Sequence, residues 1–137
     1  MMEKFTIEDD IKVFCETAKS FPGGIMDAHK ELESIIACSK QRRYFGVLNT
    51  NTKGVIIYKA AAEEIYQGEA EELGCETILI VSGKYISLVF EDYIRNIPDI
   101  EKVFQLLEAY PGIDPEGYCI EWYINEKDVR YMVKLIS

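Results

Sequence analysis

The residues best suited to chemistry lie in one short segment near the C-terminus, residues 118–124. Its sequence, Tyr-Cys-Ile-Glu-Trp-Tyr-Ile, is rich in aromatic and β-branched residues and lies between a glycine and an asparagine, which predicts a strand. Because successive side chains of a strand point to opposite faces, Glu121 and Tyr123 share one face and Trp122 lies on the other. A carboxylate in a largely covered strand needs a partner, a water molecule or a ligand. Glu121 is therefore the first candidate for a functional residue.

Glu121 could act in three ways. A buried carboxylate attracts cations, and aromatic faces beside it add cation–π and stacking contributions of about 0.5–2 kcal/mol each. In a hydrolase, Glu121 would orient or deprotonate a water molecule while Tyr123 donates a proton to the leaving group. The second carboxylate of such an enzyme would come from Glu33, Glu63 or Glu64. In a purely structural role, Glu121 would form a salt bridge with a lysine or arginine.

Charge and composition exclude several classes of protein. A chain of 137 residues with 48% hydrophobic residues fits one soluble domain, residues 1–137. The net charge of −9 argues against direct nucleic-acid binding, which needs clustered lysine and arginine. The first twenty residues contain three acidic residues in succession and no apolar core of a signal peptide, and no apolar run approaches the roughly 20 residues of a membrane span. We therefore expect a cytoplasmic protein with no membrane contact.

The cysteines and the histidine give little support to a metal site. Cys15, Cys38, Cys75 and Cys119 are far apart in sequence, which predicts reduced core thiols. His29 is the only histidine, so the chain lacks the residues of a typical zinc site, and no cofactor is expected. His29 lies on or beside the apolar stripe of a predicted helix, where a half-buried, hydrogen-bonded histidine is favoured over a catalytic one.

Hydrophobic periodicity gives the elements that position these residues. The patterns predict strands at 11–17, 44–48, 55–59, 76–81, 85–90, 118–124 and 129–136, and helices at 25–38 and 98–110. Residues 1–10 are expected to form a short lead-in. The strands 44–48 and 55–59 should form a hairpin across a polar turn. The second of them should continue into the alanines at 60–62, and the acidic rest of 60–73 should be an exposed crossover in which a helical turn can form.

The order strand–helix–strand–strand occurs twice, in residues about 11–62 and about 76–137, with a crossover at about 63–75. Such a duplicated βαββ unit predicts an α+β fold, in which a mainly antiparallel sheet has both helices on one face. The opposite face would then form a ligand cleft between the halves, with Glu121 and Tyr123 on it. In the alignment of the repeats Glu121 corresponds to Phe45, so aromatic side chains from both halves could converge on the carboxylate.

Four segments, in order, resemble the GyrI-like, or effector-binding, small-molecule-binding domain. They are Tyr44-Phe45-Gly46-Val47, residues 58–64 (Tyr-Lys-Ala-Ala-Ala-Glu-Glu), residues 74–77 leading into 81–85, and residues 118–123. The family includes drug-sensing parts of bacterial multidrug transcription regulators and stand-alone gyrase-inhibitory proteins. The resemblance covers most of residues 11–136 and implies that residues 55–62 form a strand.

The resemblance implies a bacterial protein and favours small-molecule binding over catalysis, with an enzyme left open. In the family, a buried glutamate surrounded by aromatic residues holds lipophilic, often cationic, molecules, and Glu121 is at the matching position. The implied ligand-binding residues are Glu121, Tyr123, Phe45, Tyr44, Tyr58 and Trp122, with Tyr131 and Phe14 as weaker candidates. Direct control of transcription is not expected, because no helix-turn-helix segment is present. Some relatives hydrolyse reactive electrophiles, so a hydrolase with Glu121 and Tyr123 as catalytic residues remains an alternative. Other members of the family inhibit gyrase, which suggests a second alternative, a protein partner that binds the acidic segment 63–72.

Overall fold

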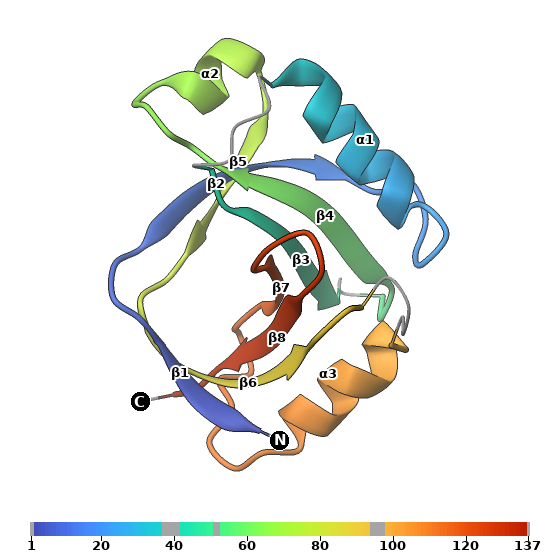
Figure 1. Ribbon diagram of the computed structural model, residues 1–137, viewed down its shortest axis with the longest axis vertical. Helices are drawn as coiled ribbons and strands as arrows, with labels where there is room; N and C mark the ends of the chain where they lie inside the picture. The colour runs from blue at the N-terminus through green and yellow to red at the C-terminus, as the bar shows by residue number, and fades with distance from the viewer. Residues whose placement is uncertain (1, 37–41, 51–52, 94–97, 137) are drawn as a thin grey trace. The chain divides into compact units, whose positions relative to one another are not determined.

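The computed structural model describes residues 2–36, 42–50, 53–93 and 98–136. The chain forms two compact units (Figure 1). One is continuous, Asp10–Ile80, and is called the central unit here. The other combines Met1–Asp9 with Val81–Ser137 and is called the terminal unit. In the described ranges no helix is long and apolar enough to cross a lipid bilayer.

The central unit is an antiparallel sheet with a helix packed on it. Its strands are β2 (Ile11–Thr17), β3 (Tyr44–Thr50), β4 (Ile56–Glu63) and β5 (Glu76–Ile80), in the order β3-β4-β2-β5. Helix α1 (Ile25–Ile35) runs along β4, and its buried residues are Ala28 and Leu32 (Figure 1). A short helix, α2 (Glu69–Leu73), lies between β4 and β5.

The terminal unit repeats this plan. Its strands are β1 (Glu3–Ile7), β6 (Gly83–Phe90), β7 (Cys119–Tyr123) and β8 (Val129–Lys134), in the antiparallel order β1-β6-β8-β7. Helix α3 (Ile100–Glu108) buries Val103, Phe104 and Leu107, and it packs on β8 and β6. The apolar spacing along α3 therefore explains which side of the helix meets the sheet.

Helix α3 begins with a side-chain cap. The carboxylate of Asp99 accepts a hydrogen bond from the Lys102 backbone N–H at 3.3 Å, which satisfies one of the donors that the first helical turn leaves open. We expect Asp99→Ala to lower the free energy of unfolding by about 1 kcal/mol, as for other N-cap residues. Asp99→Asn keeps the acceptor and is the control in urea unfolding. An Ala variant as stable as the Asn variant would contradict this role for the cap.

The predicted α+β class and antiparallel pairing are confirmed. Both units contain strand–helix–strand–strand, as β2-α1-β3-β4 and β6-α3-β7-β8, and β3 and β4 form the expected hairpin. Strand β4 runs through the alanines to Glu63, and α2 supplies the helical turn in the acidic segment. The end of the predicted helix 25–38 and part of the turn after β3 lie outside the described residues.

Two elements differ from the sequence predictions. The expected lead-in at residues 1–10 is wrong, because Glu3–Ile7 forms β1 and pairs with β6. Only Phe5 and Ile7 turn inward from this edge strand, so its alternation is too short to detect. Strand β5, which the sequence placed with the second repeat, pairs with β2 in the central unit.

Candidate functional site

Glu121 and Tyr123 come together on β7 as strand alternation predicts. Glu121 is 2% exposed, and its Oε1 accepts a hydrogen bond from the Tyr123 hydroxyl at 2.9 Å. Across the ladder Glu121 is opposite Tyr131 of β8. Glu121 and Tyr123, two positions apart on β7, therefore form a hydrogen-bonded pair in which the carboxylate is buried and the phenol is half-buried.

Other aromatic side chains surround this pair. The ring of Tyr93 lies 6.0 Å from the ring of Tyr123, and Tyr131 packs edge-on against Phe90 and Phe104, each at 5.5 Å. Burial, and then the charge of Glu121, raise the pKa of Tyr93 and Tyr131, so both phenols stay protonated at neutral pH. Tyr131 is 2% exposed, whereas Tyr93 and Tyr123 are only half-buried. Glu121 thus has three tyrosines near it, of which Tyr93 and Tyr123 are partly exposed.

The face on which Glu121 lies corrects one expectation. Tyr131 is opposite Glu121 and its ring contacts Phe104 of α3, so Glu121 shares the face of the sheet that α3 covers. The sequence analysis placed Glu121 on the face away from the helices, and this is wrong. The sequence correctly predicted which residues of β7 share a face. Alternation does not tell which of the two faces α3 covers, because that depends on tertiary packing.

Trp122 lies on the other face of β7. Its ring meets the ring of Phe5 edge-on at 5.4 Å. Its partner across the ladder is Arg130, whose guanidinium lies 4.0 Å from the centre of the Phe5 ring. Trp122 therefore packs against β1 and is separated from Glu121 by the sheet.

Tyr44 and Tyr58 belong to the face of the central unit on which α1 lies. Tyr58 is 1% exposed, and its hydroxyl lies 2.7 Å from Nε2 of His29 in α1. Pairing of Tyr44 with Ala62 places Tyr44 on the same face. Burial lowers the pKa of His29 from 6.5 to about 4, so its imidazole is neutral at pH 7. The prediction of a half-buried, hydrogen-bonded histidine is confirmed.

Phe45 lies on the opposite face from Tyr58. It is completely buried and pairs with Ala61. Ala61 follows Ala60 and precedes Ala62, which point to the face that α1 covers, so Ala61 and Phe45 point to the other face. Glu121, in contrast, lies on the helix-covered face of its own unit. The repeat alignment that matched Phe45 with Glu121 is therefore shifted by one residue, which exchanges the faces.

The glutamates of the acidic segment 63–72 make contacts within the central unit, four of them with cationic side chains. Its contacts are Glu63 with Arg43 at 2.6 Å, Glu69 with Arg42 at 2.7 Å, Glu64 and Glu71 with Lys12 at 3.3 and 3.1 Å, and Glu72 with the Tyr66 hydroxyl at 2.8 Å. Acidity alone thus no longer argues for a protein partner at this segment. Glu63 and Glu64, which the hydrolase hypothesis needed as a second carboxylate, are engaged in ion pairs.

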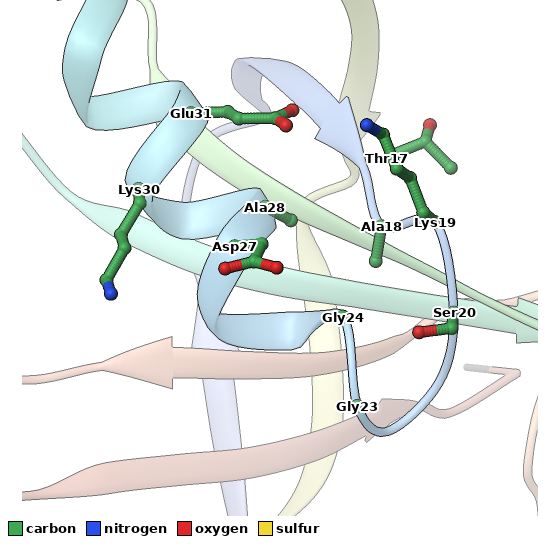
Figure 2. Close-up of a pocket in the computed structure, with 10 residues that line it drawn as sticks. All are labelled: Thr17, Ala18, Lys19, Ser20, Gly23, Gly24, Asp27, Ala28, Lys30 and Glu31. Carbon is green, nitrogen blue, oxygen red and sulfur yellow. The ribbon is translucent and has the colours of Figure 1, made fainter.

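Two of the cavities lined by described residues lie away from Glu121. One, of about 260 Å³, lies between the end of β2 and the start of α1, and Figure 2 shows Glu31 pointing toward β2 and Lys30 pointing away. Its wall includes Gly24, where a Cβ would be 2.7 Å from the Ser20 carbonyl oxygen. The other, of about 350 Å³, is lined by Lys4, residues 110–112 and Leu135. Glu121 lines neither of these two cavities.

The described part of the chain shows no group of three His, Cys, Asp or Glu side chains that could hold a metal ion. Cys15, Cys75 and Cys119 are free thiols, and Cys38 lies outside the described residues. Burial raises the pKa of Cys15 and Cys119 to about 12, so neither is a thiolate at neutral pH.

Sequence reasoning gave too little weight to Tyr131 and missed Tyr93. Tyr131 was only a weaker candidate, although its parity in the last strand places it opposite Glu121 once the β7–β8 register is known. Tyr93 follows β6 in a turn, where no periodicity identifies its direction. Its backbone N–H donates to the Lys127 carbonyl at 2.8 Å, which holds this turn beside the turn between β7 and β8.

No protein-family model and no curated protein matches this sequence. Solved structures do resemble it. One is an integron cassette protein from Vibrio cholerae, VCH_CASS2, which has 12% identity and a TM-score of 0.66 over 98% of this chain and 95% of that one. Another is SAV2435 bound to tetraphenylphosphonium, with 10% identity and a TM-score of 0.68 over 98% of this chain and 93% of that one. A third is a candidate bacterial transcription regulation protein from Staphylococcus aureus MU50, with 11% identity and a TM-score of 0.59 over 100% of this chain and 97% of that one. At these identities the likeness shows a shared fold.

Proposed function

We propose that this chain is a small-molecule-binding protein of the GyrI-like, effector-binding type, with residues 1–137 as one domain. Its ligands are lipophilic molecules, cationic or aromatic, held at Glu121. The observation that supports this most is a carboxylate only 2% exposed, with the Tyr123 hydroxyl on it and the rings of Tyr93 and Tyr131 around it.

Burial makes a carboxylate costly, and the hydrogen bond from Tyr123 offsets part of that cost. A cation with its charge spread over apolar groups offsets more, because it loses little hydration on burial and interacts favourably with aromatic faces. Tyr93 and Tyr123 are half-buried, so a ligand would reach Glu121 by moving between these two rings.

The likeness to solved structures supports the ligand class. One of the proteins with this fold is described as bound to tetraphenylphosphonium, a cation whose charge is shielded by four aromatic rings. Another is described as a candidate transcription regulation protein, in keeping with a sensor role for the fold. Glu121 in the present chain is the acidic group that we assign to such a cation.

Isothermal titration with tetraphenylphosphonium tests the proposal. We expect Glu121→Gln to weaken binding at least about tenfold, equivalent to 1.4 kcal/mol, because the neutral amide keeps the shape but loses the charge. The matched control is Glu108→Gln, an exposed carboxylate in α3 that accepts from the Cys119 thiol at 3.7 Å. It removes the same charge from the same unit and should leave the affinity unchanged.

Two outcomes would contradict the proposal. Wild-type protein that shows neither heat of binding nor a raised unfolding temperature with the cation has no such site, since a ligand of the native state must stabilise it. An equal loss of affinity for tetraphenylphosphonium in Glu121→Gln and Glu108→Gln would mean that only the overall negative charge of the protein attracts the cation.

A further inference from the structure

Two turns lie side by side at one end of the sheet of the terminal unit. Val129 begins β8 and pairs with Phe90, the last residue of β6, and with Tyr123, the last residue of β7. The turns that follow β6 and β7 therefore start next to each other. The turn after β6 carries Tyr93, whose ring lies 6.0 Å from the Tyr123 ring with an angle of 49° between the planes. The position of this turn thus decides where the Tyr93 ring lies.

Asp128, at the end of the turn after β7, connects the two turns. Its Oδ1 accepts a hydrogen bond from the Asp92 backbone N–H at 3.0 Å. A second connection is the bond from the Tyr93 backbone N–H to the Lys127 carbonyl at 2.8 Å. Hydrogen bonds from the Asn125 side chain and then from the Asp92 N–H hold the pKa of Asp128 below its usual range. Asp128 is therefore a carboxylate at neutral pH, and a charged acceptor strengthens its bond to Asp92.

The backbone of Asp92 depends on this connection. Its φ is 55°, in the left-handed region where residues other than glycine are uncommon. The bond to Asp128 supports this conformation, and the φ of Asp92 sets the direction in which the chain continues to Tyr93. Without the carboxylate, Asp92 can return to a more common conformation, which moves Tyr93 away from Tyr123. The turn after β7 keeps its own shape, because Asn125 Oδ1 accepts from two of its backbone N–H groups at 2.7 and 2.9 Å.

We propose that Asp128 is a positioning residue that holds Tyr93 beside Tyr123 and thereby controls how fast a ligand reaches and leaves Glu121. This inference rests on the proposed function, in which the ligand passes between these two rings, and it names the group that regulates access to the site. Tyr93 must move each time a ligand enters or leaves, so a firm hold on its turn slows both steps. Because the same barrier opposes entry and exit, the hold affects the two rates more than the affinity.

NMR line-shape analysis of a tetraphenylphosphonium titration measures both rate constants. We expect Asp128→Ala to raise the association and dissociation rate constants at least about threefold and to change the dissociation constant less than about twofold. Asp128→Asn keeps an oxygen acceptor for the Asp92 N–H, so its rate constants should stay within about twofold of the wild-type values. Glu126→Ala removes one negative charge at an exposed position of the same turn and controls for the effect of charge on association.

Tyr93→Ala shows whether Asp128 acts through Tyr93. This variant alone should raise both rate constants, because it removes the ring that narrows the entrance. Adding Asp128→Ala to it should then change neither rate constant further, as expected for two residues that act together. In the absence of ligand, the nuclear Overhauser effects between the rings of Tyr93 and Tyr123 should weaken in Asp128→Ala and persist in Glu126→Ala.

The possible failures are distinct. If Glu121→Gln weakens tetraphenylphosphonium binding while Asp128→Ala has the rate constants of Glu126→Ala, the inference is overturned and the proposed function stands. An effect of Asp128→Ala that remains undiminished in the Tyr93→Ala background also overturns it, because Asp128 then acts by another route. If wild-type protein does not bind the cation, the proposed function fails and the inference fails with it.

Discussion

Glu69→Gln is expected to lower the free energy of unfolding by about 3–5 kcal/mol, because it leaves the charge of Arg42 buried without its counter-ion. The side chains are 2% exposed for Arg42 and 7% for Glu69. Two guanidinium nitrogens donate to the two carboxylate oxygens at 2.8 and 2.7 Å. The Arg42 guanidinium also holds the pKa of Glu69 below its usual range, so the pair is ionised at neutral pH.

The pair also connects elements of the central unit. Arg42 donates to the Glu63 carbonyl at 2.7 Å, and its guanidinium lies 5.4 Å from the centre of the Phe14 ring. Glu69 accepts from the Ile65 backbone N–H at 3.0 Å, which ties α2 to the end of β4. Loss of the ion pair therefore affects β2, β4 and α2 together.

Urea unfolding followed by circular dichroism measures this effect. Glu72→Gln on the same helix is the control, because its exposed contact with Tyr66 should contribute less than about 1 kcal/mol. Changing both Arg42→Met and Glu69→Leu should recover most of the lost stability, since apolar side chains can replace a buried ion pair. If the free energy of unfolding of Glu69→Gln lies within about 1 kcal/mol of the wild-type value, the buried charge of Arg42 is tolerated without its counter-ion and the prediction is wrong.

The second large effect is a loss of stability in acid through His29. The pKa of His29 is about 4 in the folded chain against an ordinary value of 6.5, so the unfolded chain takes up a proton first as the pH falls. The stability that depends on the neutral imidazole is complete above pH 6.5 and declines toward pH 4, by about 3 kcal/mol in total.

His29→Gln isolates this contribution. The amide keeps a polar group near the Tyr58 hydroxyl but does not titrate. The stability difference between wild type and variant should therefore shift by about 3 kcal/mol in favour of the variant between pH 7.5 and pH 4. Because the chain has one histidine, a proton NMR titration reads its pKa directly. An imidazole that titrates between pH 6 and 7 would contradict the effect of burial.

Local pattern was enough to predict several parts of the fold. Strand β2 begins and ends where the sequence indicated, at Ile11 and Thr17, and the β3–β4 hairpin follows from two apolar runs around a polar turn. The shared face of Glu121 and Tyr123 follows from alternation alone. These features depend on neighbours within a few residues.

The remaining features depend on contacts that are distant in sequence. Nothing near Glu3 indicates its pairing with Ser87, and nothing in β7 indicates that α3 covers the face of Glu121. The misplacement of Phe45 has the same origin, because weak identity between the halves leaves their alignment uncertain by one residue, and one residue reverses the face. Tertiary packing decided these features.

The pairing of β1 with β6 also determines the order in which the chain can fold. The central unit is continuous, so its sheet can be complete when residue 80 has left the ribosome. Strand β1 belongs to the terminal unit, and its partner strand β6 begins at Gly83. Strand β1 therefore stays unpaired with β6 while the whole central unit is synthesised. Closing this long loop is slow because its contacts are non-local. Strand β1 is thus made before the central unit but pairs with its partner strand only after that unit has been made.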